Sequence, residues 1–308
     1  MASLDRHFEK FHSQIALDVG RVERIKSAHQ ALRRYVDQDG PLAKVRTEVF
    51  LQGSYAQHTA IRPSQGGEFD VDVVLGIDAK DPADWLWDSN REPGKILEWL
   101  ASRLRTVPAY SGKVRRRKRC VRIEYAGEFH MDVVPAHAPN GADAGVEVPD
   151  AGSSRWIRSH PKSYMLWCGK RNDFSDGRFS RVTKYLKWWR NNRVPTNARP
   201  KSIVLQTLIG THVPGRALTD AEAVVRVLDQ MSNQFGQHEF FFSTPEVRNP
   251  VQSEEDFAGA WDDSSAFSFG VHLRRAAERA KTAMSEPREA RSAQLWQEVF
   301  GDAFPLGV

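Results

Sequence analysis

The stretch Phe69-Asp70-Val71-Asp72-Val73-Val74-Leu75 combines two aspartates with a run of β-branched and apolar residues. Such a run predicts a β-strand, in which successive side chains point to opposite faces of the sheet. Asp70 and Asp72 therefore share one face. Two neighbouring carboxylates on a largely apolar strand repel each other at a cost of several kcal/mol unless a cation lies between them. Mg²⁺, which carboxylates hold together with substrate phosphates, is the cation that this pattern favours.

A third aspartate, Asp132, lies within the apolar segment 128–135. Residues 119–125, the glycine Gly127 and this segment together predict a β-hairpin. Asp132 would then lie in the middle of a strand between hydrophobic residues, where an unpaired charge is unfavourable. Asp132 is therefore either a further metal ligand or the partner of a nearby arginine in an ion pair.

The pair Gly53-Ser54 follows the short apolar run 49–51. A strand that leads through small residues into a helix exposes backbone N–H groups, which can bind a phosphate. Glycine permits close approach of the backbone, and the serine hydroxyl adds a hydrogen-bond donor. Because Gly-Ser pairs are also common in ordinary turns, the indication comes from their order and spacing relative to the three aspartates.

These segments resemble the polymerase-β-like nucleotidyltransferase superfamily, and within it the bacterial cyclic GMP–AMP synthase/DncV-like nucleotidyltransferases of anti-phage defence. The resemblance is carried by residues 51–55, 59–63, 69–74, 131–135, 179–189, 200–202 and 295–305. It implies an α+β fold in which a polymerase-β-like core, a twisted mixed sheet with helices, is joined to a C-terminal helical domain, with the active site in the cleft between them. Residues 1–155 are predicted to form the core with its long N-terminal helix, and residues 156–308 the helical domain that completes the nucleotide cleft.

The resemblance also implies roles for individual residues. Three aspartates would be catalytic and would hold two Mg²⁺ ions, for which Mn²⁺ can substitute: Asp70, Asp72 and Asp132. The triphosphate would be bound by Gln52, Gly53, Ser54, Lys184 and Ser202. ATP and other nucleoside triphosphates would be the substrates, and members of the family can require an activating protein partner.

The implied function is the condensation of ATP, with a second ribonucleoside triphosphate, into a cyclic di- or trinucleotide second messenger. A ribose hydroxyl would attack the α-phosphate and release pyrophosphate at a two-metal centre. Two alternatives stay open. One is a nucleotidyltransferase that acts on RNA or protein, and the other is a catalytically silent nucleotide or nucleic-acid sensor on the same fold.

Two positions depart from the family pattern. His58 stands where members commonly carry a glycine, in the loop after Gly-Ser. The loop would then be stiffer, or the imidazole would touch the substrate. Ile203 follows Ser202 where an aromatic side chain often stacks on a base, so the base preference is not given by the resemblance.

A helix is predicted from Ser180, a candidate N-cap, to Arg193. Its buried stripe follows the i, i+3, i+4, i+7 spacing and consists of Val182, Tyr185, Leu186 and Trp189. Lys184 lies off this stripe, where a lysine either contacts the triphosphate or is simply solvated; Lys187 is the second candidate for the phosphate contact.

Further helices are predicted over residues 17–36, 95–104 and 203–210, the last with Ser202 as its N-cap. A cap and a phosphate contact are compatible, because both use the helix N-terminus. Residues 136–155, rich in Gly, Ala, Pro and Asp, are predicted to be a loop or a domain crossover, and the chain beyond about Trp156 is predicted to be helical.

A formal charge of +5 on 308 residues favours anionic partners mildly. Six of the seven residues 113–119 are basic. They form either a nucleic-acid patch or a charged edge of the hairpin that prevents strand-to-strand aggregation. The edge is favoured, because no aromatic residues interleave with the charges. Activation by nucleic acid is accordingly not the favoured hypothesis.

The chain carries two cysteines, Cys120 and Cys168. They provide neither a disulfide framework nor the four ligands of a structural zinc site. No apolar run approaches the roughly 20 residues that a membrane span needs, and the N-terminus lacks the apolar stretch of a signal peptide. The sequence therefore predicts a cytoplasmic protein without a membrane partner.

Overall fold

The computed structural model describes residues 4–63, 67–78, 92–125, 127, 129–215, 219–239 and 243–308. The chain divides into two compact units. The sheet unit consists of Leu17–His58 and Arg62–Leu166. The helical unit consists of Met1–Ala16, Thr59–Ile61 and Trp167–Val308. This division differs from the predicted one at three places, because the first 16 residues and residues 59–61 belong to the helical unit and residues 156–166 belong to the sheet unit.

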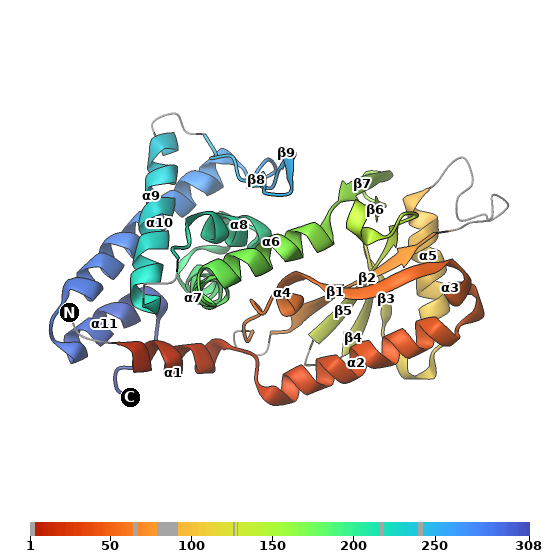
Figure 1. Cartoon of the computed structure of the whole chain (residues 1–308), viewed down its shortest axis with the longest axis horizontal. Coiled ribbons are helices and arrows are strands. Elements are labelled where there is room, and N and C mark those ends of the chain that lie inside the picture. The colour runs from red at the N-terminus through yellow and green to blue at the C-terminus, as the bar shows by residue number, and fades with distance from the viewer. Residues whose placement is uncertain are drawn as a thin grey trace. The chain divides into compact units, whose positions relative to one another are not determined.

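The strands described in the sheet unit form one mixed sheet (Figure 1). Its main path runs through β1 (Arg46–Gln52), β2 (Phe69–Ile77), β5 (Phe129–His137), β4 (Val121–Tyr125) and β3 (Val114–Arg116). Strands β2 and β5 are parallel, whereas the other neighbours on this path are antiparallel. The predicted α+β class, the strand at residues 69–75 and the hairpin around Gly127 are thereby confirmed. Ala126 and Glu128, on either side of this glycine, lie outside the described residues.

One face of the sheet is covered by the helices α2 (Val19–Gln38) and α5 (Pro93–Arg105), as predicted for residues 17–36 and 95–104. The core between them includes Val71 and Val73 of β2 and Met131 and Val133 of β5. Because side chains alternate along a strand, Asp70, Asp72 and Asp132 project from the opposite face. The short helix α3 (Gly40–Val45) connects α2 to β1.

The prediction of a loop over residues 136–155 is wrong. Strand β6 (Val146–Asp150) lies within this segment and pairs with β5 and with β7 (Arg155–Ser159). The composition resembles that of a loop, but cross-strand pairing outweighs local propensity here. The start of the helical part at Trp156 is wrong for the same reason, since helix α6 (Pro161–Phe174) begins only after β7.

The helical unit is built mainly from long helices. After α6 these are α7 (Arg178–Arg193), α8 (Ser202–His212), α9 (Asp220–Glu239), α10 (Asp263–Ser285) and α11 (Glu289–Phe300). A small hairpin joins β8 (Arg248–Asn249) to β9 (Gln252–Asp256). The stripe predicted on α7 is buried, as expected: Val182, Tyr185, Leu186 and Trp189.

Helix α1 (Asp5–Ile15) was not anticipated from the sequence. Its Phe8 and Phe11 are fully buried and pack against the rings of Tyr185 and Phe300. Phe304, beyond α11, completes this aromatic cluster. The long-range contacts explain why α1 belongs to the helical unit although it opens the chain.

The basic run 113–119 contains β3, the edge strand on the main path of the sheet. Its arginines face carboxylates: Arg115 lies 3.3 Å from Glu124, and Arg119 lies 2.7 Å from Asp150. These pairs fit the interpretation of a charged sheet edge.

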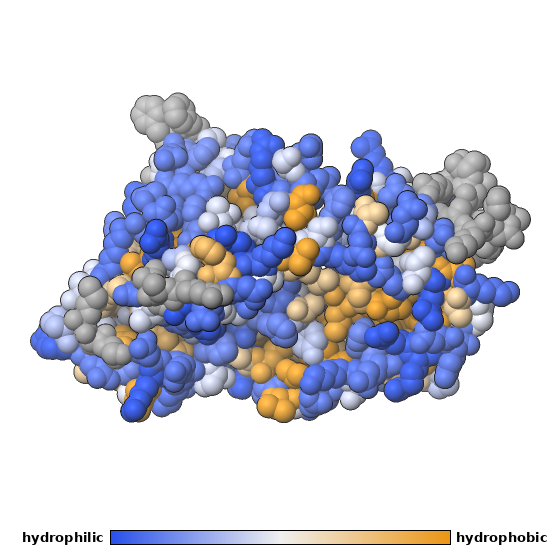
Figure 2. All heavy atoms as spheres, viewed as in Figure 1, coloured by the Kyte–Doolittle hydropathy of each residue, from blue (hydrophilic) through white to orange (hydrophobic). Residues whose placement is uncertain are grey.

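The surface in Figure 2 is mostly hydrophilic, with apolar side chains gathered in the sheet unit over β1. Most residues of this strand are only partly buried. Across the described residues, none of the helices has the length and apolar character that a membrane crossing requires.

Candidate active site

Four polar residues form one row across four neighbouring strands. Gln52 of β1 is the register partner of Asp72 in β2, which in turn pairs with Asp132 of β5. Asp132 pairs on its other side with Arg122 of β4. Asp70 lies two residues before Asp72, on the same face. The sheet thus brings together the three predicted aspartates and Gln52.

Arg122 joins two of these carboxylates. Its Nε and Nη2 donate to the two oxygens of Asp132 at 2.7 and 2.8 Å, and Nη2 also donates to Oδ1 of Asp70 at 2.9 Å. The side chains of Arg122 and Asp132 are only 18 and 13 % exposed. The hydrogen bonds to Asp132 raise the pKa of Arg122 above its usual value. Of the two alternatives for Asp132, the ion pair with an arginine is therefore present in this structure.

The position of Arg122 bears directly on metal binding. Within the part of the chain that the structure describes, no three His, Cys, Asp or Glu side chains gather as a metal-binding group. The guanidinium takes the place that a cation would have between Asp70 and Asp132. The three aspartates still fit Mg²⁺, because their carboxylate oxygens lie on one face of the sheet and are ligands of the kind that this ion prefers. Their negative charges also require a positive charge nearby. Arg122 thus already neutralises part of the negative charge that a metal ion would balance.

Gly53 lies directly beside this row. A Cβ atom added to it would lie only 2.2 Å from Oδ2 of Asp72, and its φ is +69°. Both facts demand glycine, the first for space and the second for backbone conformation. The glycine at position 53 thus lets the backbone come close to the carboxylate of Asp72. Ser54 follows in α4 (Gly53–Ala56), a single helical turn, and its contact with phosphate stays a prediction.

His58 adopts a φ of 56°, in the left-handed region. Its backbone N–H donates to the carbonyl of Tyr55 at 3.1 Å and closes the turn after α4. Glycine adopts this conformation with less strain than other residues do. The exposed imidazole of His58 adds no fold contact that the structure records.

In the helical unit, Lys184 and Lys187 differ in their surroundings. Lys187 is buried, and its ammonium donates to the backbone carbonyl and the hydroxyl of Thr59 at 3.1 and 3.3 Å. The ammonium of Lys184 lies 3.1 Å from Nε2 of His12 in α1. Lys187 is thus held by Thr59 and Lys184 by His12, and the phosphate contact of Lys184 stays a prediction.

Burial and the charge of Arg181 lower the pKa of Lys184. Burial, together with Lys184 and Arg181, lowers the pKa of His12 to about 4. His12 is therefore neutral near pH 7, and its Nε2 accepts the hydrogen bond from the lysine. Arg181 itself is held by Asp220 at 2.8 Å. The side chain of Lys184 is thus half-buried and held beside His12. It differs from the alternative of a simply solvated lysine.

Both capping predictions are wrong. Helix α7 begins earlier than expected, after Gly177 with a φ of 76°. The amide of Ser180 donates instead to the side chain of Asn172 at 3.0 Å. Helix α8 has Lys201 as its N-cap, and the hydroxyl of Ser202 accepts from Nη1 of Arg190 at 3.1 Å. Ser202 remains exposed at the start of α8, so its contact with phosphate stays a prediction.

Arg122 and His12 were missed by sequence reasoning. A signal existed for Arg122, because it and Asp132 are equally distant from Gly127 and therefore face each other in a hairpin. None existed for His12, whose partner Lys184 lies far along the chain.

Comparison with known proteins gives concordant results. Residues 1–172 match the family model described as the Second Messenger Oligonucleotide or Dinucleotide Synthetase (SMODS) domain. The cyclic AMP-AMP-AMP synthase of an Acinetobacter species is 25 % identical over 297 residues, which cover 95 % of this chain and 83 % of that protein.

Solved structures with the same fold include Bradyrhizobium diazoefficiens CdnG in complex with GTP. It has a TM-score of 0.78 at 19 % identity, and the match covers 98 % of this chain and 96 % of that one. The complex of Escherichia coli CdnC with HORMA-deltaN matches with a TM-score of 0.76 at 17 % identity, covering 98 % of both chains. The chain therefore belongs to the SMODS family, the cyclic GMP–AMP synthase/DncV-like nucleotidyltransferases.

Proposed function

We propose that this protein condenses ATP, with a second ribonucleoside triphosphate, into a cyclic di- or trinucleotide that serves as a second messenger in anti-phage signalling. The observation that carries the proposal is the row of Gln52, Asp72 and Asp132 across the sheet, with Gly53 packed closely against Asp72. Family membership supports the same reaction. These nucleotides are those of the cytoplasm, where we expect the protein to act.

The proposed roles follow from the chemistry of the row. Asp70, Asp72 and Asp132 would hold two Mg²⁺ ions, which when bound activate the attacking hydroxyl and neutralise charge on the triphosphate. The guanidinium of Arg122 holds Asp70 and Asp132 in place. The lone pairs of the carboxylate oxygens that these hydrogen bonds leave open would bind the metal ions.

The triphosphate would be held by groups from both units. In the sheet unit, the backbone of Gly53 and the hydroxyl of Ser54 donate to phosphate oxygens, with Gln52 beside them. In the helical unit, the ammonium of Lys184 and the hydroxyl of Ser202 do the same, and the lysine compensates charge on the departing pyrophosphate. That the nucleotide lies in a cleft between the domains stays a prediction.

A protein partner is also proposed as an activator. The match to a structure of CdnC with HORMA-deltaN supports looking for such a partner. Nucleic-acid activation is not favoured, because two arginines of the basic edge, Arg115 and Arg119, already face carboxylates.

The test is product analysis. The protein is incubated with all four ribonucleoside triphosphates and Mg²⁺ or Mn²⁺, treated with phosphatase and analysed by mass spectrometry. A phosphatase-resistant cyclic product is expected. It should be lost in Asp72→Asn and Asp132→Asn and kept in the control Asp143→Asn, whose side chain is 85 % exposed.

Two other outcomes would contradict the proposal. Extension of an added RNA or modification of a protein, without a cyclic product, would favour the alternative transferase. If calorimetry shows that Asp70→Asn and Asp72→Asn bind ATP with Mg²⁺ as tightly as the parent does, Asp70 and Asp72 are not part of the metal site.

A further inference from the structure

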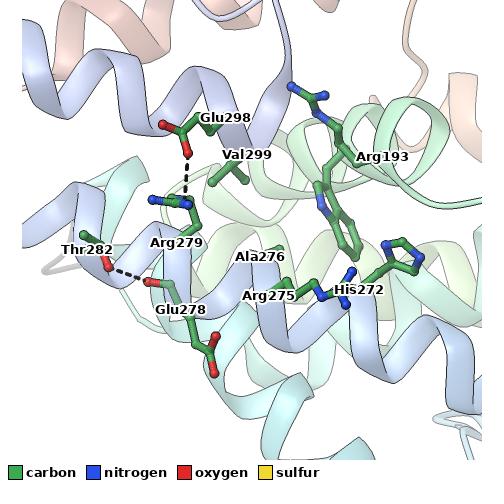
Figure 3. Close-up of a pocket in the computed structure, with 10 residues that line it drawn as sticks. Arg193, His272, Arg275, Ala276, Glu278, Arg279, Thr282, Glu298 and Val299 are labelled. Atoms are coloured by element: carbon green, nitrogen blue, oxygen red, sulfur yellow. Dashed lines mark hydrogen bonds and ion pairs between the residues drawn. The ribbon is translucent and has the colours of Figure 1, made fainter.

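A pocket of about 500 Å³ lies in the helical unit between α7, α10 and α11 (Figure 3). Its floor is apolar and includes Trp189, Ala276 and Val299, all of which are buried. Its walls consist of long charged side chains, mainly arginines. A pocket of this size, with an apolar floor and convergent polar groups, is typical of a small-molecule site.

One wall of the pocket carries unbalanced positive charge. It is lined by Arg193 of α7 and by His272 and Arg275 of α10. Neither arginine forms an ion pair with any residue in the described part of the chain, and Arg193 donates only to the carbonyl of Gln297 at 3.1 Å. Burial and the charge of Arg275 lower the pKa of His272. The guanidinium of Arg275 lies beside the imidazole of His272, whereas that of Arg193 points to the other end of the pocket (Figure 3). Arg275 and the imidazole together match an anion with several oxygens, such as a phosphate.

The other wall carries Arg279 and two glutamates, Glu278 and Glu298. Nε of Arg279 lies 3.0 Å from Oε2 of Glu298, an ion pair drawn as a dashed line in Figure 3. The remaining oxygen of Glu298 can accept a hydrogen bond from a hydroxyl or amino group. The pocket therefore offers an anion site at one wall, an acceptor at the other and an apolar floor between them.

We propose that this pocket binds a nucleotide. Arg275 binds its phosphate beside His272, Glu298 accepts a hydrogen bond from its sugar or base, and the base covers the apolar floor. The pocket is separate from the aspartate row, because all its lining residues belong to the helical unit. Within α7, Arg193 follows Lys184 by nine residues, about 13 Å along the helix axis. A substrate nucleotide and a cyclic product share the required chemistry, and the experiment distinguishes these two sources.

The experiment uses the full chain with Asp70→Asn and Asp72→Asn, in EDTA, so that no product forms. Binding of ATP, cyclic triadenylate and inorganic phosphate is measured separately by calorimetry. Arg275→Glu is added to remove the anion site. Arg274→Glu is the matched control, because Arg274 is exposed on the same helix and does not line the pocket.

We expect at least one of the two nucleotides to bind with a Kd below about 1 mM, at least tenfold more tightly than inorganic phosphate. Arg275→Glu should weaken this binding at least tenfold, and Arg274→Glu less than twofold. Binding of ATP alone identifies a substrate nucleotide as the ligand, and binding of the cyclic product alone identifies a product site.

The proposal is overturned if neither nucleotide binds, if phosphate binds equally well, or if the two arginine variants behave alike. Thermal unfolding of each variant shows that it is folded. Because the assay involves no catalysis, its result is independent of whether the proposed synthase reaction is correct.

Discussion

Arg122 and Asp132 are register partners on neighbouring strands and are joined by two hydrogen bonds of 2.7 and 2.8 Å. The same guanidinium reaches Asp70 at 2.9 Å. The arginine therefore supplies the positive charge that the carboxylate row requires in the absence of metal. Its removal should leave Asp132, which is mostly buried, without a counter-charge.

Arg122→Met is expected to lower the free energy of unfolding in EDTA by about 3 kcal/mol, the usual cost of breaking a buried ion pair. Mg²⁺ should then raise the Tm of this variant more than that of the parent, because the metal no longer competes with the guanidinium. Thermal unfolding with and without MgCl₂ measures both effects. Arg115→Met is the control, since the Arg115 side chain is 50 % exposed and pairs with Glu124 at the sheet edge. Equal Mg²⁺ shifts in parent and variant would contradict this account.

Gly53→Ala should reduce both stability and product formation. The added Cβ meets Asp72 at 2.2 Å and forces the carboxylate to move. Gly112→Ala is a matched control, because Gly112 has a φ of +73° and no atom within 4 Å of its Cβ position. The control should cost about 1 kcal/mol for the left-handed backbone alone, and Gly53→Ala about 1–3 kcal/mol more. Chemical denaturation measures the difference. Equal losses of stability in the two variants would show that the Asp72 side chain moves aside without cost.

His58→Gly distinguishes a conformational role of His58 from contact with substrate. Relief of the left-handed strain and the greater entropy of glycine in the unfolded chain nearly cancel, so stability should change by less than about 0.5 kcal/mol. His58→Val should cost about 2 kcal/mol, because a β-branched residue is poorly tolerated at positive φ. An unchanged KM for ATP in His58→Gly is expected. A KM that rises at least fivefold would instead assign the imidazole to the substrate.

The position of each aspartate within its own strand could be predicted from the sequence. Strand alternation places Asp70 and Asp72 on one face, and the hairpin about Gly127 places Asp132 in the middle of a strand. The buried stripe of α7 follows from helical periodicity in the same way. These features depend on a few neighbouring residues, whereas the pairing of β2 with β5 joins distant segments, and only the family resemblance implied that the three aspartates come together.

The features that were missed depend on contacts between distant segments. Strand β6 has the composition of a loop and is a strand because β7 pairs with it. Helix α1 is anchored by aromatic rings more than 170 residues away in the chain, such as Tyr185. Capping residues were misplaced at α7 because an asparagine in the preceding helix, Asn172, receives the amide of Ser180. Local propensity carries no information about such partners.

The contact between His12 and Lys184 predicts a pH dependence of stability. The pKa of His12 falls from 6.5 to about 4 in the folded chain, chiefly through burial. Between these values the unfolded chain binds more protons than the folded one, so stability rises with pH in this window. The contribution is fully present above pH 6.5 and is lost as the pH falls towards 4. Since His12 is only partly buried, we expect it to amount to about 1–2 kcal/mol.

His12→Gln removes the titration and keeps a side chain that can accept a hydrogen bond from Lys184. The free energies of unfolding of parent and variant are compared by urea denaturation at pH 7.5, 6 and 5. Other histidines with lowered pKa, such as His29 and His272, are present in both proteins and cancel in the difference. The stability of the parent relative to His12→Gln should therefore decrease by about 1 kcal/mol or more between pH 7.5 and 5. A difference that stays constant would mean that His12 is not held in its neutral form by burial beside Lys184.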